Sequence, residues 1–580
     1  MSFRVCIGHA ATRLLFLAIT LLLLAPPACA STYVVYLPLD SPIYDQLDTL
    51  NSLGYLDDYL DEIKPISRVE AARLVIQAQQ NFDDAPNPDL IAQALIGDLH
   101  DQLREEIGWI DSNQEDNPPM VRLQPVDRSE AQYIYSHGPS RFWRFGSGNT
   151  NGNTLTADEG TPLLPNHDGI PTAPGSNEVL SVNSWGGLGG FFTAYGDTAI
   201  TGPIRRTPND TARLRPLGAE AVVGLGDWAL SFGQEEMWWG PGHFEATSQS
   251  NNASPIPGFR LQNIHPTQLP GFLRYLGPFR LQVFFGRLDA GRTPSRAPGS
   301  AILATFARPW IDGQVLAFKP LPTFEWGITH AIMFGGAGNN NYTTLGFLGR
   351  ATGLATGSIS QGNTNSRGGV YLKFIFPRLR NSILFVETLG EDNLTGEIPV
   401  IGRVLPFLAV TYHGGYYLPR VTKDGRTDFR FEWAIAEPNY STHDDSLYWA
   451  YTDHLMGDPL GPNSSQMDFQ VGRWLRGLTK GSVDLFFTDR APKVAGNIFV
   501  PAAFYGRSST LSHERSIGLS FDLLTIPESP RMRAELLSYG RTHLGFEYVD
   551  HVNFGSPGAF RAVAQITIGI KPKFEGFSWH

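Results

Sequence analysis

Cysteine is nearly absent from this chain of 580 residues. It occurs twice, as Cys6 and Cys29, and both positions lie within the first thirty residues. The remaining sequence can therefore form no disulfide and cannot hold a metal through thiolates. Basic side chains are also in the minority, with 45 against 56 acidic ones and a formal net charge of -11. Because a negative field repels phosphate, we exclude nucleic acid as a partner.

Long apolar runs are equally scarce, and the clearest one, Leu14 to Ala25, lies near the start of the chain. Arg4 and Arg13 precede it and small residues follow it up to Ala30, a pattern typical of a secretory signal peptide. We therefore predict a signal peptide over residues 1–30, cleaved after Ala30. The run is too short for a membrane anchor, which needs roughly 20 apolar residues. Lipidation of Cys29 is the less favoured alternative, because the expected leucine and small residue before it are missing.

Aromatic residues and glycine are abundant, at 12% of the chain and 61 residues respectively. This combination favours many strands and turns. A large secreted all-β protein and a transmembrane barrel both fit it, since a closed barrel satisfies its backbone hydrogen bonds without any long apolar run.

Residues 31–120 instead show helical patterns. Ser41 can cap a first helix that Gly54 ends, and a capping box of the S-x-x-E type over Ser67–Glu70 begins a second. A third is expected from Pro88 to Leu103. None is long or apolar enough to cross a membrane, so we expect a small soluble layer.

From Val121 onward the hydrophobic period changes to two, and the opposite face often carries charge. A soluble sandwich and a membrane barrel share this alternation. Short connections such as Pro377 to Ser382 alternate with long ones such as Gly335 to Gly369, and aromatic residues lie near many strand ends, which favours the barrel. The alternating segments are Val370, Leu372, Phe374 and Phe376 opposite Lys373; Phe429, Phe431, Trp433 and Ile435 opposite Arg430 and Glu432; Ile517, Leu519, Phe521 and Leu523 opposite Ser516, Ser520 and Asp522; and Met532, Ala534 and Leu536 opposite Arg531, Arg533 and Glu535.

The predicted fold is a mostly β, antiparallel outer-membrane barrel over residues 121–580. At about 25 residues per strand with its share of loop, this length gives about 18 strands. The last strand-like stretch, Arg561 to Phe574, is expected to close the barrel against the first strand. Phe574 and Trp579 lie close to the aromatic end usual in such barrels, although His580 is the last residue.

The most distinctive stretch is Phe232 to Pro257, FGQEEMWWGPGHFEATSQSNNASPIP, which follows a hairpin turn expected at Gly226 and Asp227. It resembles the capsule assembly Wzi family, as do the early stretches SPIYDQLDTLNSLGYLD and KPISRVE. Beyond Asn263 the resemblance is one of general pattern only. Ser254 stands where the family frequently has arginine, so no contact of that arginine is carried over. The residues that carry the resemblance are Gln234, Glu235, Trp238, Trp239, Gly240, Pro241, Gly242, Ser250, Asn251, Asn252, Ala253 and Pro257.

The resemblance implies an outer-membrane barrel of about 18 strands with a helical bundle at its periplasmic mouth. It implies binding of capsular or exopolysaccharide and a part in its assembly or attachment at the surface. Outer-membrane lipid and the polysaccharide export machinery are the other partners expected. No cofactor, metal or catalytic reaction comes with it.

The paired tryptophans offer apolar surfaces on which sugar rings stack, and nearby carboxylates and amides can bind hydroxyl groups. The alternative is structural: one tryptophan belongs to a lipid-facing aromatic belt and the other packs the turn. The candidate polysaccharide-binding residues are Trp238, Trp239, Glu235, Glu236, Asn251 and Asn252.

Other polar clusters favour structural interpretations. Glu235 and Glu236 would point to opposite faces of a strand, which is a poor arrangement for glycoside hydrolysis. We interpret Asp453, His454 and Asp458 as a polar surface loop, because their spacing is not that of metal ligands. A charge ladder inside the barrel is favoured over a ligand site for Arg430, Arg531 and Arg533 with Glu432 and Glu535.

Two other functions stay open at this point. A wide barrel alone would equally support a diffusion channel. A secreted glycan-cleaving enzyme would need a pair of facing carboxylates that the sequence does not reveal, and G-x-S-x-G, H-E-x-x-H and phosphate-cradling motifs are absent.

Overall fold

The computed structural model describes most of the chain after the predicted signal peptide. The described residues are 33–111, 118–145, 155–203, 213–290, 308–337, 364–391, 411–437, 440–441, 447–452, 454–491, 513–527, 537–554, 557–570 and 576–579. The signal peptide predicted for residues 1–30 and the strand predicted around Arg531, Arg533 and Glu535 lie outside these ranges.

Four helices follow one another near the N-terminus: α2 (Pro42–Leu53), α3 (Arg68–Asp84), α4 (Leu90–Gln102) and α5 (Arg104–Asp111). The capping signals act as predicted. The Ser67 hydroxyl accepts a hydrogen bond from the backbone of Glu70, and Gly54 ends α2 in the left-handed conformation at φ 90°. The predicted third helix is α4, which ends at its C-cap Leu103 as expected, and α5 is a further short helix that was not predicted. No helix in the described part of the chain is long and apolar enough to cross a membrane.

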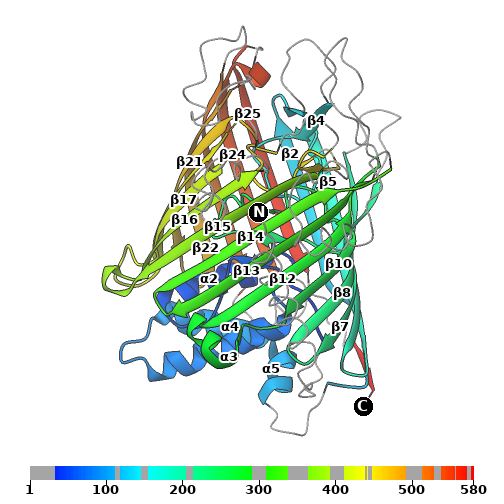
Figure 1. The fold of residues 1–580 in the computed structure, drawn as a ribbon. Helices are drawn as coiled ribbons and strands as arrows, with labels where there is room; N and C mark the ends of the chain where they lie inside the picture. Colours follow the sequence, from blue (N-terminus) through cyan, green and yellow to red (C-terminus); the bar gives the residue numbers. More distant parts are fainter. Residues whose placement is uncertain are drawn as a thin grey trace, which may run out of the picture.

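The strands close into an antiparallel barrel, strongly tilted in Figure 1. Eighteen described strands form its wall, as the sequence predicts. In order around the barrel they are β2 (Val121–His137), β5 (Gly175–Leu188), β6 (Phe192–Pro203), β7 (Arg213–Leu225), β8 (Trp228–Gln234), β10 (Gly258–Asn263), β12 (Pro278–Arg287), β13 (Trp310–Leu321), β14 (Phe324–Phe334), β15 (Thr364–Phe376), β16 (Ser382–Glu391), β17 (Thr411–Leu418), β18 (Thr427–Ala436), β21 (Ser464–Trp474), β22 (Leu478–Arg490), β23 (Glu514–Ile526), β24 (Tyr539–Asp550) and β25 (Ala559–Ile570).

Closure comes from pairing of the last long strand with the first. Gln132 of β2 faces Thr567 of β25, and the short β26 (Phe577–Trp579) extends this seam by pairing with Val121–Leu123. The prediction that the stretch beginning at Arg561 closes the barrel is therefore confirmed.

The two ends of the barrel differ. Short turns, such as the one at Gly226 and Asp227 between β7 and β8, lie at the end that carries the helices and the C-terminus (Figure 1). Longer connections, such as residues 235–257 between β8 and β10, join strand ends at the opposite end. The long connection predicted to reach Gly369 is shorter at its far side, because β15 already begins at Thr364.

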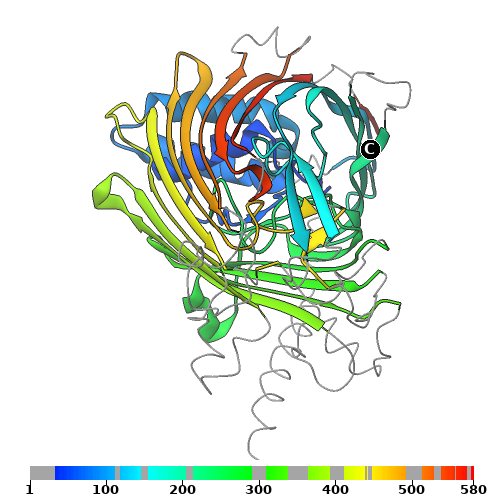
Figure 2. The same ribbon diagram turned by 90° about the horizontal axis from the view of Figure 1, so that it is seen from above.

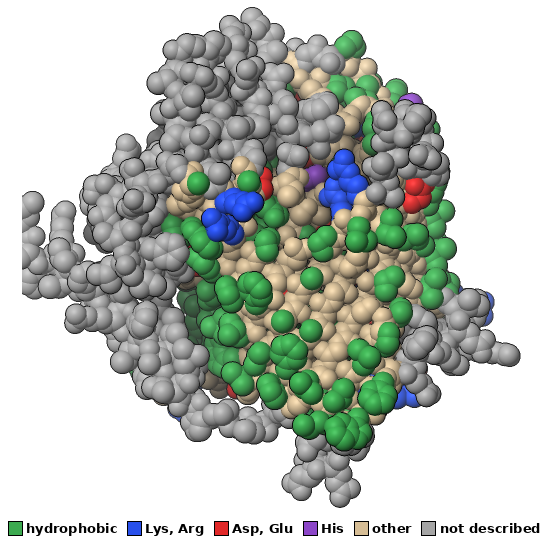
Figure 3. Space-filling view, turned by 90° about the vertical axis from the view of Figure 1, so that its right-hand side faces the viewer, with side chains coloured by type: hydrophobic (Ala, Val, Ile, Leu, Met, Phe, Trp, Pro, Cys, Tyr) green, Lys and Arg blue, Asp and Glu red, His purple; other side chains and the backbone are tan. Residues whose placement is uncertain are grey.

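Apolar side chains cover the outer face of the barrel, as Figure 3 shows for one side. In β23, Ile517 and Leu523 are 47% and 42% exposed, whereas Ser516 and Ser520 point inward and are buried. An apolar outer face and a polar inner face are the alternation that the sequence predicts for a membrane barrel.

The interior of the barrel is filled rather than empty. Viewed along the barrel, the N-terminal helices lie across one end of the ring of strands (Figure 2). Their apolar faces join a buried cluster with inward side chains of the wall, among them Trp474, Leu478 and Leu524. We call residues 33–111 the helical segment.

Candidate functional site

The connection between β8 and β10, residues 235–257, folds into the barrel, and we call it the inner loop. Its Trp238–Trp239 pair forms the short strand β9, which pairs with β1 (Ile63–Lys64) of the helical segment. The backbone N–H of Gly240 adds a hydrogen bond of 3.0 Å to the carbonyl of Glu62. The motif therefore joins the helical segment to the barrel.

Glycine is required where the inner loop meets the wall. A Cβ atom on Gly242 would lie 2.2 Å from the His413 ring, and one on Gly313 of β13 would lie 2.7 Å from the Trp239 ring. These contacts explain how a bulky loop fits inside the barrel.

Trp239 is 2% exposed, and its indole N–H donates to the Gln282 side chain at 2.5 Å. It packs in a cluster with Ile63, Met333 and Trp449. Its ring has no free face for a sugar in this structure. The interpretation that places a tryptophan in a lipid-facing belt is wrong, because both Trp238 and Trp239 lie inside the barrel.

Trp238 lines a cavity of about 410 Å³ between the helical segment and the inner loop, which we call the larger cavity. Phe385 and Tyr417 of the wall add further aromatic surface. Its polar lining includes Arg430 and Lys480, and the Lys480 ammonium lies 3.6 Å from the carboxylate of Asp45.

Arg430 forms one of the ion pairs of the charge ladder predicted inside the barrel. Its guanidinium lies 3.5 Å from Glu432 and stacks over the Tyr417 ring at 4.3 Å from the ring centre. It also faces the larger cavity, so the ladder and a ligand site are compatible at this position.

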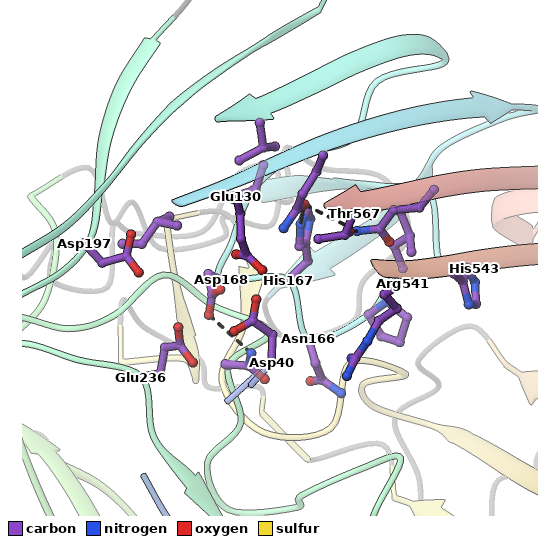
Figure 4. A pocket seen from close by; sticks show the side chains of 18 of the residues that line it. Asp40, Glu130, Asn166, His167, Asp168, Asp197, Glu236, Arg541, His543 and Thr567 are labelled. Carbon is purple, nitrogen blue, oxygen red and sulfur yellow. Dashed lines mark hydrogen bonds between the residues drawn. The ribbon is translucent and has the colours of Figure 1, made fainter. Parts of the chain in front are cut away.

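A second cavity of about 260 Å³, the smaller cavity, adjoins the larger one and shares part of its lining, including Asp40 and Asn251. Figure 4 shows its acidic side chains converging. Asn251 donates a hydrogen bond of 3.2 Å to Asp168, and the backbone N–H of Leu39 donates one of 2.8 Å to Glu236. Burial, followed by the charge of neighbouring carboxylates, raises the pKa of Asp168 and Glu236 well above the usual values.

Glu235 points elsewhere. It accepts a hydrogen bond from the Tyr195 hydroxyl beside the pair of Glu220 and Arg260, whose side chains are 2.7 Å apart. Burial and then the charge of Glu220 raise the pKa of Glu235 to about 8. Asn252 also makes an internal contact: its side-chain amide donates a hydrogen bond of 3.1 Å to the backbone carbonyl of Leu455.

The six predicted site residues therefore divide into two groups. Trp238, Glu236 and Asn251 line the two cavities. The other three, Trp239, Glu235 and Asn252, pack behind them. Sequence reasoning missed the partners that complete the lining, and no local pattern marks them because they come from distant segments. They include Asp40, Asn166, Asp168, Lys480 and Arg541.

The predicted polar surface loop is wrong. His454 and Asp458 are 5% and 1% exposed, because this connection also turns into the barrel. Asp458 accepts a hydrogen bond of 2.7 Å from the backbone of Leu460, and burial raises its pKa to about 6. Asp453 lies outside the described residues.

Among the described residues, one tight group of carboxylates could geometrically hold a metal ion: Asp61, Glu62 and Glu325. The ammonium of Lys373 already occupies the middle of it, 3.0 Å from both Glu62 and Glu325, and contacts Asp61 as well. This group is therefore an internal ion-pair cluster that ties the helical segment to the wall.

Comparison with known proteins gives one family match, one relative and two similar solved structures. The model of a family described as capsule assembly protein Wzi matches residues 146–514, more than half of the chain. An uncharacterized 55.8 kDa protein in the cps region of Klebsiella pneumoniae is 25% identical over 198 residues, 32% of this chain, and the match spans only 35% of that relative's length.

The solved structure of Wzi from Escherichia coli, an outer membrane protein involved in group 1 capsule assembly and a carbohydrate-binding β-barrel, superposes with a TM-score of 0.60. The match covers 92% of this chain and 99% of that one at 16% identity, which shows a common fold. The outer membrane protein OprD of Pseudomonas aeruginosa gives a TM-score of 0.41 at 8% identity, over 79% of this chain and 95% of that one.

Proposed function

The chain belongs to the capsule assembly protein Wzi family, and from this we propose that it binds surface polysaccharide in the outer membrane and takes part in capsule or exopolysaccharide assembly or attachment. The observation that carries the proposal is the larger cavity, which part of the distinctive family motif lines. The relative of known structure is a carbohydrate-binding barrel of the same fold, which supports this function.

The lining of the larger cavity has the chemistry that sugars require. Trp238, Phe385 and Tyr417 present aromatic surface, while Arg430 and Asn251 present hydrogen-bond donors. Its volume lies within the range of small-ligand sites, roughly 300–1,000 Å³. We propose that Trp238, Asn251 and Glu236 contact the polysaccharide and that Trp239, Glu235 and Asn252 hold them in place.

The remaining parts of the proposal concern location and partners. Residues 1–30 act as a signal peptide cleaved after Ala30, the helical segment faces the periplasm, and residues 121–580 form the membrane barrel. Outer-membrane lipid surrounds the wall, and the polysaccharide export machinery is a further partner. We assign no catalytic reaction to the protein, because Glu235 and Glu236 diverge instead of facing one another.

The test is binding of the purified, detergent-solubilised protein to the surface polysaccharide of its source organism, measured by calorimetry. We expect Trp238→Ala to weaken binding at least tenfold. Trp579→Ala is the matched control, because Trp579 is 62% exposed and lies far along the chain at the barrel seam. Retained heat-modifiable migration on gels shows that each variant is folded.

The outcomes separate function from site. Failure of the wild-type protein to bind native polysaccharide would overturn the function. Wild-type affinity in Trp238→Ala would leave the function standing and remove the larger cavity as its site.

A further inference from the structure

The rim of the barrel that carries the helices is basic along one arc. This arc begins at the short 3₁₀ turn η1 (Gly271–Leu276) ahead of β12 and includes the turns β13–β14, β15–β16, β17–β18 and β21–β22. The strands that they connect run side by side in the wall (Figure 1). Among the described residues, no carboxylate pairs with five arginines of these turns. We call the five the basic arc: Arg274, Arg378, Arg380, Arg426 and Arg476.

The acidic side chains of this part of the rim are already neutralised. Asp424, the one carboxylate in the described turns of the arc, lies 3.2 Å from Arg473. Asp89 of the helical segment reaches the same rim and lies 2.8 Å from Arg420. The basic arc therefore adds positive charge that the described part of the chain does not balance.

The turns of the arc form a connected surface. Arg380 donates a hydrogen bond of 2.9 Å to the carbonyl of Val421, which joins the β15–β16 turn to the β17–β18 turn. Arg426 donates one of 2.7 Å to the carbonyl of Leu475, which joins that turn to β21–β22. At the other end of the arc, η1 packs against β13. Arg426 is half-buried in this arrangement, and the other four arginines are exposed.

Large apolar side chains lie among these arginines. Phe272 and Tyr275 of η1 are 79% and 73% exposed, and Leu379 and Leu475 are exposed in the turns that follow. The guanidinium of Arg274 lies over the Tyr275 ring, 5.2 Å from the ring centre. This mixture of apolar and basic side chains is typical of segments at the boundary between lipid tails and headgroups.

The other side of the same rim provides an internal comparison. Its β5–β6 turn, residues 189–191, and its β7–β8 turn at Gly226 and Asp227 contain no lysine or arginine. Phe191 and Leu225 are nevertheless 45% and 58% exposed there. Exposed apolar surface thus occurs on both sides of the rim, whereas the unpaired arginines occur on one. Contact with lipid tails alone does not account for that difference.

We propose that the basic arc binds the phosphate headgroups of anionic glycerophospholipids, such as phosphatidylglycerol, in the leaflet that surrounds this rim. Guanidinium groups bind phosphate through paired hydrogen bonds, and anionic lipid attracts basic side chains near its surface. The exposed apolar side chains beside the arginines continue the apolar outer face of the wall, which favours lipid over an acidic protein as the occupant. The inference rests on the membrane location in the proposed function and not on polysaccharide binding.

The experiment is native mass spectrometry of the full-length protein, released from detergent micelles that contain equal amounts of phosphatidylglycerol and phosphatidylcholine with identical acyl chains. We expect the wild type to retain roughly fivefold more phosphatidylglycerol than phosphatidylcholine. The triple variant Arg274→Gln, Arg378→Gln, Arg476→Gln should lower that ratio about threefold or more, because it removes three phosphate ligands. Retained heat-modifiable migration on gels shows that the variant is folded.

The matched control removes the same charge from exposed strand ends at the opposite rim, with Arg213→Gln, Arg287→Gln and Arg515→Gln. It should keep the wild-type ratio. Equal retention of the two lipids by the wild type overturns the proposal, as does an equal fall of the ratio in both triple variants. An unchanged ratio in the first variant overturns the assignment to the basic arc. Retention of neither lipid would count against the membrane location as well, whereas polysaccharide binding is measured separately by calorimetry.

Discussion

Ile63 of the helical segment and Trp239 of the inner loop face each other across a two-stranded antiparallel sheet inside the barrel. The pair joins two parts of the chain that are far apart in sequence. It also shows that half of the paired-tryptophan motif is devoted to internal packing, while Trp238 alone reaches the larger cavity.

The fit between Trp239 and the wall can be tested from the side of the wall. Gly313→Ala would place its Cβ 2.7 Å from the Trp239 ring, so the buried ring must move. We expect a loss of about 1–3 kcal/mol in the free energy of unfolding, measured by denaturant titration in detergent. Gly196→Ala is the control, because its Cβ would have nothing within 4 Å. If Gly313→Ala costs as much in a Trp239→Ala background as alone, the two residues are not coupled.

Lys373 is expected to hold the helical segment in place. Lys373→Met would leave Glu62 without its buried counter-ion, at a cost of about 3–5 kcal/mol. The measurement is the midpoint temperature of heat modification on gels, which should fall. Lys423→Met, at an exposed turn, should leave that temperature unchanged. An unchanged midpoint in Lys373→Met would show that the ion-pair cluster does not stabilise the fold.

The buried position of Asp458 predicts a dependence of stability on pH. Its pKa is raised by burial from 3.8 to about 6, so the folded state binds its proton more tightly than the unfolded state. Its contribution is therefore fully present below about pH 4 and is lost as the pH rises towards 6. Asp458→Asn should match the wild type at pH 4 and exceed it at pH 7 by on the order of 1–3 kcal/mol. A stability difference that stays constant between these pH values would contradict the shift.

Ion conduction separates the proposed function from a diffusion channel. The helical segment packs against inward residues of the wall, and the inner loop occupies the middle of the barrel. In a planar bilayer the wild-type protein should therefore be silent. Lys373→Met should show occasional openings, because the helical segment is held less firmly. Steady large conductance of the wild type would favour the channel.

Much of the wall could be predicted from sequence because alternation reports directly on which side chains point outward and which point into the barrel. Ile517 and Leu523 face outward as expected, and β25 closes on β2. The caps at Ser67 and Gly54 act locally, so their prediction needed no tertiary information.

The content of the barrel could not be predicted in the same way. A loop that folds into a polar interior has the same composition as a surface loop. The prediction that Asp458 lies in an exposed loop was therefore wrong, and the residue is buried inside the barrel. The smaller cavity joins Asp40, Glu130 and Asp197 across the fold, and no local pattern marks such a meeting. The paired tryptophans were ambiguous because belt, packing and ligand roles all use the same side chain.

An even number of strands returns the chain to the rim at which it entered, so Val121 and Trp579 are paired neighbours there. A short epitope tag fused after Trp579 would share that rim with the helices. A tag inserted between β24 and β25 would emerge at the opposite rim (Figure 1). Antibody staining of intact and of permeabilised cells with these two tags can therefore establish which way the protein is inserted.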